Sequence, residues 1–537
     1  MAKKSPSTIR IGKRYRSTRL DGPYDALVIG SGIGGLTTAA CLSKMGKKVA
    51  VLEQHYTAGG FTHSYERAGY EWDVGIHYIG DVGSKHTLSR RIFDFITARQ
   101  LKWAPMGKHF DRIFLGDQHY DLVAGKKPYR RALVNAFPDQ EAAIDQYLEY
   151  MRKTKDAVRS STMERLLPGW LAALKRRWRQ SRQPWFVNAP TRQVLESLTS
   201  NQELIAVMTG QWGDCGLPPA QSSFQIHTMI ALHYMYGAYY PVGGGSRIAE
   251  TVRPIIQAAG GEVFTYASVE QIVLQGGRAV GVKMADGHEI RAPLVISNAG
   301  VFNTFNKLLP SGTDEQAKLP TVQPSMASAC LYIGLKHTAE DLGLPKTNFW
   351  IYPSADYEGD IERFMADPSQ EIPLVYISFP SAKDPAFEEK YPGRSTIEIV
   401  APGPMEWFEK WAGTQWGKRG EDYDALKEQI SQRLLQALYQ KLPQLEGKVD
   451  YYELSTALST DYFCRYDQGE IYGLDHTPQR FDQTWLKPKT SIKGLYLTGQ
   501  DILSCGVVGA MTAGVLTAVK VLGIRKGYGL LKQIMSF

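Results

Sequence analysis

The chain reads ALVIGSGIGG over residues 26–35, where a wholly apolar run passes directly into a glycine-rich turn. Such a run is typical of a central parallel strand that is buried on both faces. The turn matches G-x-G-x-x-G at Gly30, Gly32 and Gly35. The first glycine permits a tight turn, the second lets backbone approach a pyrophosphate, and the third lets the next helix pack on the strand. That helix, expected to about residue 45, would direct its free N–H groups at the phosphate.

A second apolar strand is predicted over residues 49–52, and it ends on Glu53, 21 residues after Gly32. A carboxylate at this place can accept hydrogen bonds from ribose hydroxyls. Strand, glycines, helix, strand and acid in this order predict a dinucleotide site. Gly59-Gly60 follows after a short loop. A pair without side chains suits a backbone that lies against the pyrophosphate and flavin of FAD, and an ordinary Gly-Gly turn is the alternative.

Near the C-terminus the segment LYLTGQD, residues 495–501, repeats this pattern before a long apolar helix that starts near Gly506. A helix N-terminus beside a flavin would stabilise the negative charge of the reduced ring. The alternative is simply a second buried strand–helix unit. The apolar stretch 503–523 is just long enough to span a bilayer. Its glycines at 506, 509 and 514 favour a closely packed internal helix instead.

Between these ends, residues 241–305 predict a helix, a hairpin or meander over 269–290 and a buried strand at 294–297. We therefore expect an α/β protein, in which a Rossmann-like FAD-binding domain is joined to a discontinuous α+β substrate-binding domain. The FAD-binding domain is expected to comprise residues 21–80, 241–305 and 490–522, and the substrate-binding region 81–240 and 306–489. Residues 1–20 are expected to form a basic tail and residues 523–537 a C-terminal tail.

Composition excludes several other classes of protein. The 537 residues carry a net charge of +8 and five cysteines without a CxxC pair. This pattern argues against a disulfide framework or a zinc site, so no metal is expected, and it favours a reducing compartment. No apolar segment follows the basic N-terminus, so a secretory signal is not expected. The chain has no G-x-S-x-G elbow, no phosphate-binding P-loop and no H-E-x-x-H. Its basic clusters lack a nucleic-acid-binding module, so no nucleic-acid partner is expected.

Three colinear segments carry a family resemblance: Tyr24 to Gly80, Gln211 to Gly300 and Tyr472 to Gly514. Over them the chain resembles the phytoene desaturase-like flavoproteins, within the retinol saturase and carotenoid isomerase branch. The motifs DVGIHYIG at 73–80, GDCGLPP at 213–219 and LTGQDI at 497–502 look closer to retinol saturase. One departure is Phe61, because desaturases of the wider family often have an arginine after the Gly-Gly pair. Motifs and resemblance together imply that FAD is held by Gly30, Gly32, Gly34, Gly35, Glu53, Gln54, Gly59, Gly60, Val269, Gly499 and Asp501.

The resemblance implies saturation, desaturation or isomerisation of a double bond in a hydrophobic retinoid or carotenoid-like polyene. Aromatic faces can stabilise the extended ion that forms when such a bond reacts. We place His77, Tyr234 and Tyr240 nearest the reacting region because they lie close in sequence to cofactor-binding segments, with a structural role as the alternative. Weaker candidates for the proton donor are His227, Asp475 and His476, and Cys505 is a candidate for a thiol of lowered pKa.

A helix within residues 163–187 is expected to touch a membrane. Leu167, Trp170, Leu171, Leu174 and Trp178 recur at helical spacing, and Lys175, Arg176 and Arg179 lie largely off that stripe. Tryptophan beside basic residues is typical of an interfacial helix, and a core-facing amphipathic helix is the alternative. We expect peripheral attachment to an anionic membrane surface on the cytoplasmic side.

Two other functions stay open at this point. One is a redox-neutral, FAD-dependent carotenoid cis–trans isomerase. The other is a non-enzymatic escort protein for prenylated chains, which has a related fold but no flavin.

Overall fold

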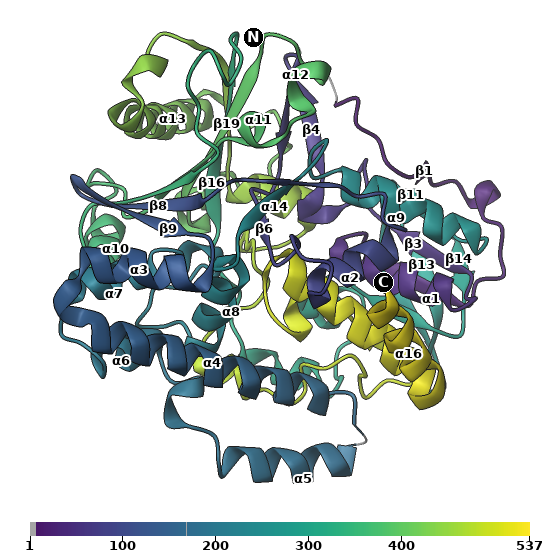
Figure 1. Cartoon of the computed structure of the whole chain (residues 1–537). Coiled ribbons are helices and arrows are strands. Elements are labelled where there is room, and N and C mark those ends of the chain that lie inside the picture. The colour runs from purple at the N-terminus through teal and green to yellow at the C-terminus, as the bar shows by residue number, and fades with distance from the viewer. Residues whose placement is uncertain (1–6, 168) are drawn as a thin grey trace.

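The computed structural model describes residues 7–167 and 169–537 and is built around a six-stranded parallel sheet (Figure 1). Every neighbouring pair in this sheet runs parallel. Five of its six strands come from the three predicted pieces of the dinucleotide unit and the sixth, β1, comes from the N-terminal segment, which confirms the predicted α/β fold class. In spatial order they are β1 (Lys13–Arg14), β11 (Glu262–Thr265), β3 (Val49–Leu52), β2 (Ala26–Ile29), β15 (Val295–Ser297) and β21 (Leu495–Leu497).

Helix α1 (Ile33–Lys44) packs on this sheet and against α16 (Gly506–Ser536). The contact is close because both helices present glycine: a Cβ on Gly514 would lie 2.6 Å from the Gly34 carbonyl oxygen. Helices α9 (Arg247–Ala258) and α2 (Leu88–Ile96) share the same apolar core. The stretch after residue 503 therefore forms a packed internal helix over much of its length. By length and composition α16 is also the one helix among the described residues that passes as a membrane span, with 50% of its most apolar window buried.

A second, mixed sheet of seven strands forms the other half of the molecule. Strands β17 and β8 pair in parallel and the other neighbours are antiparallel. In spatial order the strands are β20 (Val449–Ser455), β16 (Ser328–Leu335), β19 (Ser395–Pro402), β18 (Val375–Ser378), β17 (Asn348–Tyr352), β8 (His109–Leu115) and β9 (Gln118–Val123).

Three smaller sheets among the described residues complete the fold. The predicted meander is present as β12 (Val269–Gln275), β13 (Arg278–Met284) and β14 (Glu289–Arg291). The others are β6 (Ile79–Gly80), β10 (Ala238–Pro241) and β7 (Trp103–Pro105), and the pair β4 (Ser64–Arg67) and β5 (Tyr70–Asp73).

The remaining helices cover the second half. Between β9 and β10 lie α3 (Lys126–Ala136), α4 (Glu141–Glu164), α5 (Gly169–Gln180), α6 (Thr191–Glu196), α7 (Gln202–Thr209) and α8 (Phe224–Tyr234). Later in the chain come α10 (Tyr357–Ala366), α11 (Pro380–Lys383), α12 (Phe387–Lys390), α13 (Glu421–Lys441), α14 (Ala457–Cys464) and α15 (Pro478–Phe481). Figure 1 shows α5 beneath α4, at the lower edge of the molecule.

Both predicted tails differ from expectation. Within the basic segment 1–20, residues 13–14 form the edge strand β1 on β11, because the N-terminal chain finds unpaired backbone groups there. Residues 1–6 of that segment lie outside the described residues. The segment 523–537 is not a tail, because it continues α16 beyond a kink at Gly523 and buries Leu530 and Ile534. Pro168, expected to lie at the start of the basic helix and not within it, is also outside the described residues.

Candidate functional site

A cavity of about 1870 Å³ lies where the pieces of the dinucleotide unit meet the second half of the molecule. Apart from Gly35 and Tyr240, all residues predicted to bind the cofactor or placed nearest the reacting region contribute to its wall. They are Gly30, Gly32, Gly34, Glu53, Gln54, Gly59, Gly60, His77, Tyr234, Val269, Gly499 and Asp501. This volume exceeds the roughly 300–1,000 Å³ of ordinary ligand pockets, so it can hold a dinucleotide and a further molecule.

The glycines bring the two ends of the chain into direct backbone contact. Gly32 and Gly59 form an isolated parallel bridge. A Cβ on Gly34 would lie 2.6 Å from the Cα of Gly499, and one on Gly60 would lie 2.8 Å from the Cα of Gly32. Gly35 lies beneath the cavity, where a Cβ would lie 2.2 Å from the Gly30 carbonyl oxygen. A side chain at any of these positions would separate the segments, so glycine is required there. The surface that these glycines form is called the glycine cradle below.

Glu53 ties the first turn to the Gly-Gly loop. Its Oε2 accepts hydrogen bonds from the Ser31 amide at 2.8 Å and the Ser31 hydroxyl at 2.7 Å, and its Oε1 accepts from the His55 amide at 2.8 Å. The Ser31 hydroxyl in turn accepts from the Gly59 amide at 3.1 Å. A carboxylate offers about four lone-pair positions. Glu53 therefore orders the turn and retains capacity toward the cavity.

Asp501 holds two loops at the C-terminal edge of the cradle. Its carboxylate accepts hydrogen bonds from the Val301 amide at 2.8 Å and the Leu474 amide at 3.2 Å. Burial raises the pKa of this carboxyl above its ordinary value. Gly499, two residues earlier, has φ of +94°, a conformation that favours glycine.

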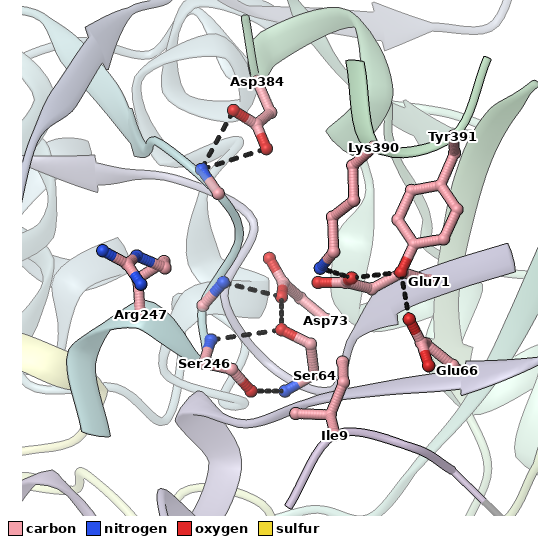
Figure 2. Close-up of polar contacts among 12 residues, drawn as sticks. Ile9, Ser64, Glu66, Glu71, Asp73, Ser246, Arg247, Asp384, Lys390 and Tyr391 are labelled. Carbon is pink, nitrogen blue, oxygen red and sulfur yellow. Dashed lines mark hydrogen bonds and ion pairs between the residues drawn. The ribbon is translucent and has the colours of Figure 1, made fainter. Parts of the chain in front are cut away.

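Tyr240 lies outside the cavity, unlike His77 and Tyr234. It is buried, and its hydroxyl donates to Asp73. Asp73 also accepts hydrogen bonds from the Ser64 hydroxyl at 2.6 Å and the Gly245 amide at 2.8 Å, as Figure 2 shows. Asp384 accepts from the Gly243 amide in the same loop. Tyr240 therefore helps to fix the loop before α9. Its closeness in sequence to a predicted cofactor-binding segment suggested a place near the reacting region, but its side chain does not reach the cavity wall.

His77 faces the cavity and is held from behind by a carboxyl group. Its Nδ1 lies 2.9 Å from Glu398 Oε2, and its carbonyl oxygen accepts from Lys383 Nζ at 3.0 Å. Burial and the Lys383 charge lower the pKa of His77 to about 3, so the imidazole is neutral. Burial raises the pKa of Glu398 to about 8. Sequence reasoning missed Glu398 and Lys383, because neither belongs to a local motif.

An aromatic wall lies next to His77. The rings of Tyr78 and Tyr234 stack with centroids 4.0 Å apart and an interplanar angle of 6°. The Tyr78 hydroxyl contacts the carboxyl groups of Asp111 and Asp214. Further apolar and aromatic residues of the cavity wall are Ile226, Met229, Ile230, Tyr332, Tyr472, Val507 and Val508.

The weaker candidates have structural partners. His227 Nε2 lies 2.8 Å from the Tyr147 hydroxyl, and the Cys505 amide donates to His476 Nε2 at 2.8 Å. Burial raises the pKa of the Cys505 thiol well above its ordinary value, which is the opposite of the lowering expected for a reactive thiolate. Asp475 does not contribute to the cavity wall among the described residues.

Comparison with known proteins agrees with the motifs. All-trans-retinol 13,14-reductase of Homo sapiens is 39% identical over 97% of this chain and 89% of its own length. Prolycopene isomerase of Arabidopsis thaliana is 26% identical over 96% of this chain and 86% of its own length. The solved structure of cyclohexylamine oxidase from Brevibacterium oxydans superimposes with a TM-score of 0.59 at 14% identity, covering 96% of this chain and 99% of that one, which shows the fold.

These relatives confirm the predicted resemblance to the retinol saturase and carotenoid isomerase branch. The family model for flavin-containing amine oxidoreductases matches residues 33–522, nearly the whole chain. A flavin is the cofactor that this family shares. The chain therefore belongs to the flavin-containing amine oxidoreductase family.

Proposed function

We propose that the protein is an FAD-dependent reductase of a carbon–carbon double bond in a retinoid. The observation that carries the proposal is one continuous cavity. It joins the glycine cradle to an apolar, aromatic part, here called the chamber, whose wall includes His77, Tyr78 and Tyr234. Near-full-length similarity to all-trans-retinol 13,14-reductase points to the same substrate class. A saturase requires both parts of the cavity, because hydride and polyene must meet in one water-poor space.

FAD fits the first part of the cavity. The backbone of Gly32, Gly34, Gly59 and Gly60 offers a surface on which no side chain obstructs a pyrophosphate. The N-terminus of α1 opens onto this surface and favours negative charge. Glu53 and Gln54 would bind the ribose, Val269 would lie beside the adenine, and Gly499 with Asp501 would border the flavin.

The departure at Phe61 removes one positive charge that the wider family often places beside the cofactor. Arg10, Arg419 and Arg465 line the same cavity and supply compensating charge. Reduced FAD supplies hydride when it is bound. The protein must then orient the polyene and provide a proton, which are tasks for His77, Tyr234 and their neighbours on the chamber wall.

Membrane attachment through α5 is a further part of the proposal. Trp170, Leu174 and Trp178 are 72%, 62% and 57% exposed, and Ala172 is the buried residue of α5. A core-facing helix would bury such side chains. Basic residues on the same helix include Lys175 and Arg177, which gives the composition of an interfacial helix on an anionic surface.

The end of α16 offers a second apolar contact with the membrane. Ile524, Tyr528 and Met535 are 85%, 71% and 52% exposed. Peripheral attachment on the cytoplasmic side suits both helices and a substrate that partitions into lipid. Co-sedimentation with acidic liposomes at low salt tests it, and a protein that stays in the supernatant would contradict it.

Product analysis tests the catalytic proposal. The flavin-loaded protein is reduced without oxygen and mixed with retinoids and carotenoids, and free reduced flavin serves as the control. We expect all-trans-retinol to gain two hydrogens and to absorb at shorter wavelength, because its conjugation is shortened. A product of unchanged mass would instead indicate the isomerase, which the similarity to prolycopene isomerase keeps as the second candidate. A protein that takes up no flavin would indicate the escort function.

A further inference from the structure

Two aspartates meet one tyrosine hydroxyl at the wall of the cavity. The Tyr78 oxygen lies 2.9 Å from Asp111 Oδ2 and 3.2 Å from Asp214 Oδ2. Tyr78 and Asp214 line the cavity, whereas Asp111, on β8, is fully buried behind them. The three residues come from separate parts of the chain, and the sequence motifs assign none of them a role.

Counting hydrogens locates a proton on Asp214. A phenol has one hydrogen to donate. Asp111 already accepts hydrogen bonds from Asn348 Nδ2 at 2.9 Å and Gln211 Nε2 at 2.7 Å. With the Tyr78 hydroxyl as a third donor, Asp111 is the charged carboxylate. The remaining contact between Tyr78 and Asp214 is then a hydrogen bond only if the Asp214 carboxyl carries the hydrogen.

The orientation of Asn348 supports this count. Lys383 Nζ donates to Asn348 Oδ1, so the amide nitrogen of Asn348 must face Asp111. Lys383 is the buried cation that interacts with Asp111, Asp73 and Glu398, and burial lowers its pKa to about 7. One buried cation cannot balance these three buried carboxylates, because an unpaired buried charge is strongly destabilising. Protons must therefore reside on some of these acids.

The surroundings of Asp214 also favour its neutral form. Burial and the neighbouring Asp111 raise the pKa of Asp214 well above its ordinary value, whereas the pKa of Asp111 rises only to about 6. No cation is among the groups that interact with Asp214 in the described part of the chain. Those groups are Tyr78, Asp111, Cys215, Tyr234, Tyr352, Tyr376, Tyr472 and Cys505.

We infer that Asp214 is the acid that delivers the proton to the polyene, and that Tyr78 and Asp111 position it. This inference rests on the proposed reductase function. Reduction adds hydride from the reduced flavin to one carbon and a proton to the other. The O–H bond of Asp214 breaks as the C–H bond forms, and the Tyr78 hydroxyl then turns from Asp111 to donate to the carboxylate that remains. Water restores the proton after the product leaves.

His77 is the competing donor on the same wall. Its imidazole is neutral, and a neutral imidazole N–H is a far weaker acid than a carboxyl group. A general acid must hold its proton at the working pH, and burial together with Asp111 shifts the pKa of the Asp214 carboxyl upward, in that direction. Asp214 is thus the better donor, and His77 is left to orient the polyene.

The test compares Asp214→Asn with Asp94→Asn. Both replace a carboxyl by an amide of equal size, but Asp94 is 4% exposed and lies away from the cavity in an ion pair with Arg90. In a single turnover of the reduced, flavin-loaded protein, Asp214→Asn is expected to slow product formation about 10²–10⁴-fold. Flavin content should stay at the wild-type level, and Asp94→Asn should leave the rate unchanged. Asp214→Glu, which keeps an acid, should recover part of the rate.

Infrared spectroscopy of the substrate-free protein gives an independent readout. A protonated carboxyl band is expected at neutral pH in the wild type and in Asp94→Asn, and its intensity should fall in Asp214→Asn. An unchanged band would overturn the inference, whatever the substrate.

The outcomes also separate the two proposals. If wild-type protein reduces retinoids and Asp214→Asn does so at a similar rate, the assignment of the proton donor fails while the function stands. If the flavin-loaded wild type reduces no polyene, the proposed function fails, and with it the role of Asp214 as its acid. If Asp214→Asn loses its flavin, Asp214→Glu is compared with the wild type instead. A rate of product formation for Asp214→Glu that is no faster than the rate for Asp214→Asn would then count against the inference.

Discussion

Gly34→Ala tests whether the two ends of the chain must touch for the cofactor site to exist. Gly34 lies in the first turn of α1 and faces the segment that follows β21. A Cβ at this position would lie 2.6 Å from Gly499 Cα, 2.9 Å from Gly499 N and 2.8 Å from Asn298 Oδ1. Ordinary contact begins at 3.4 Å, so the backbone of Gly499 must retreat by about 0.8 Å.

The expected magnitude follows from two opposing effects. Overpacking a well-filled site costs about 1–3 kcal/mol. Alanine in place of glycine returns about 1 kcal/mol through helix propensity. Gly34→Ala should therefore lower the free energy of unfolding by up to about 2 kcal/mol. The displaced Gly499 also borders the proposed flavin site, so the dissociation constant for FAD should rise about tenfold, which equals about 1.4 kcal/mol.

Titration of the flavin-free protein with FAD and denaturant unfolding measure both quantities. Gly529→Ala is the matched control: it makes the same change within α16, but its Cβ meets only Met45 Cε at 4.0 Å. This control should bind FAD normally and gain up to about 1 kcal/mol from helix propensity. If Gly34→Ala behaved like Gly529→Ala in both measurements, the proposed contact between the chain ends would not matter to the site.

Three further changes address the chamber and the surface. Tyr240→Phe should leave turnover near the wild-type value but lower the free energy of unfolding by about 1–2 kcal/mol, because Asp73 loses a hydrogen-bond donor. A large loss of turnover would instead indicate that Tyr240 takes part in the reaction. Burial raises the pKa of Glu398 to about 8. The contribution of this group to the free energy of unfolding is therefore complete at pH values below its ordinary pKa and is lost as the pH rises through 8. Glu398→Gln should flatten this dependence in thermal unfolding between pH 5 and 9, and an unchanged slope would show that Glu398 is already ionised. Replacing Trp170 and Trp178 together by serine should reduce co-sedimentation with acidic liposomes without changing FAD content, and undiminished binding would place the membrane contact elsewhere.

The cofactor half of the site was largely predictable because its signals are local. Residues 26–35 combine a buried strand with glycines whose spacing is set by the turn itself. The residues of the chamber wall were much less predictable from the sequence. Tyr240 lies three residues before Gly243 of the loop preceding α9, yet its side chain points to Asp73. Neighbouring side chains on a strand face opposite ways, so closeness in sequence does not fix which side faces a cavity.

The sequence by itself predicted a dinucleotide site and its assembly from separated pieces of the chain. These properties depend on backbone conformation and on patterns within a few neighbouring residues. Only the tertiary structure decided which acids lie in and behind the wall of the chamber. Glu398 reaches His77 from 321 positions away, and Asp111 and Asp214 are 103 positions apart. Their protonation depends on burial and on charges brought together by folding, which no local pattern of residues encodes.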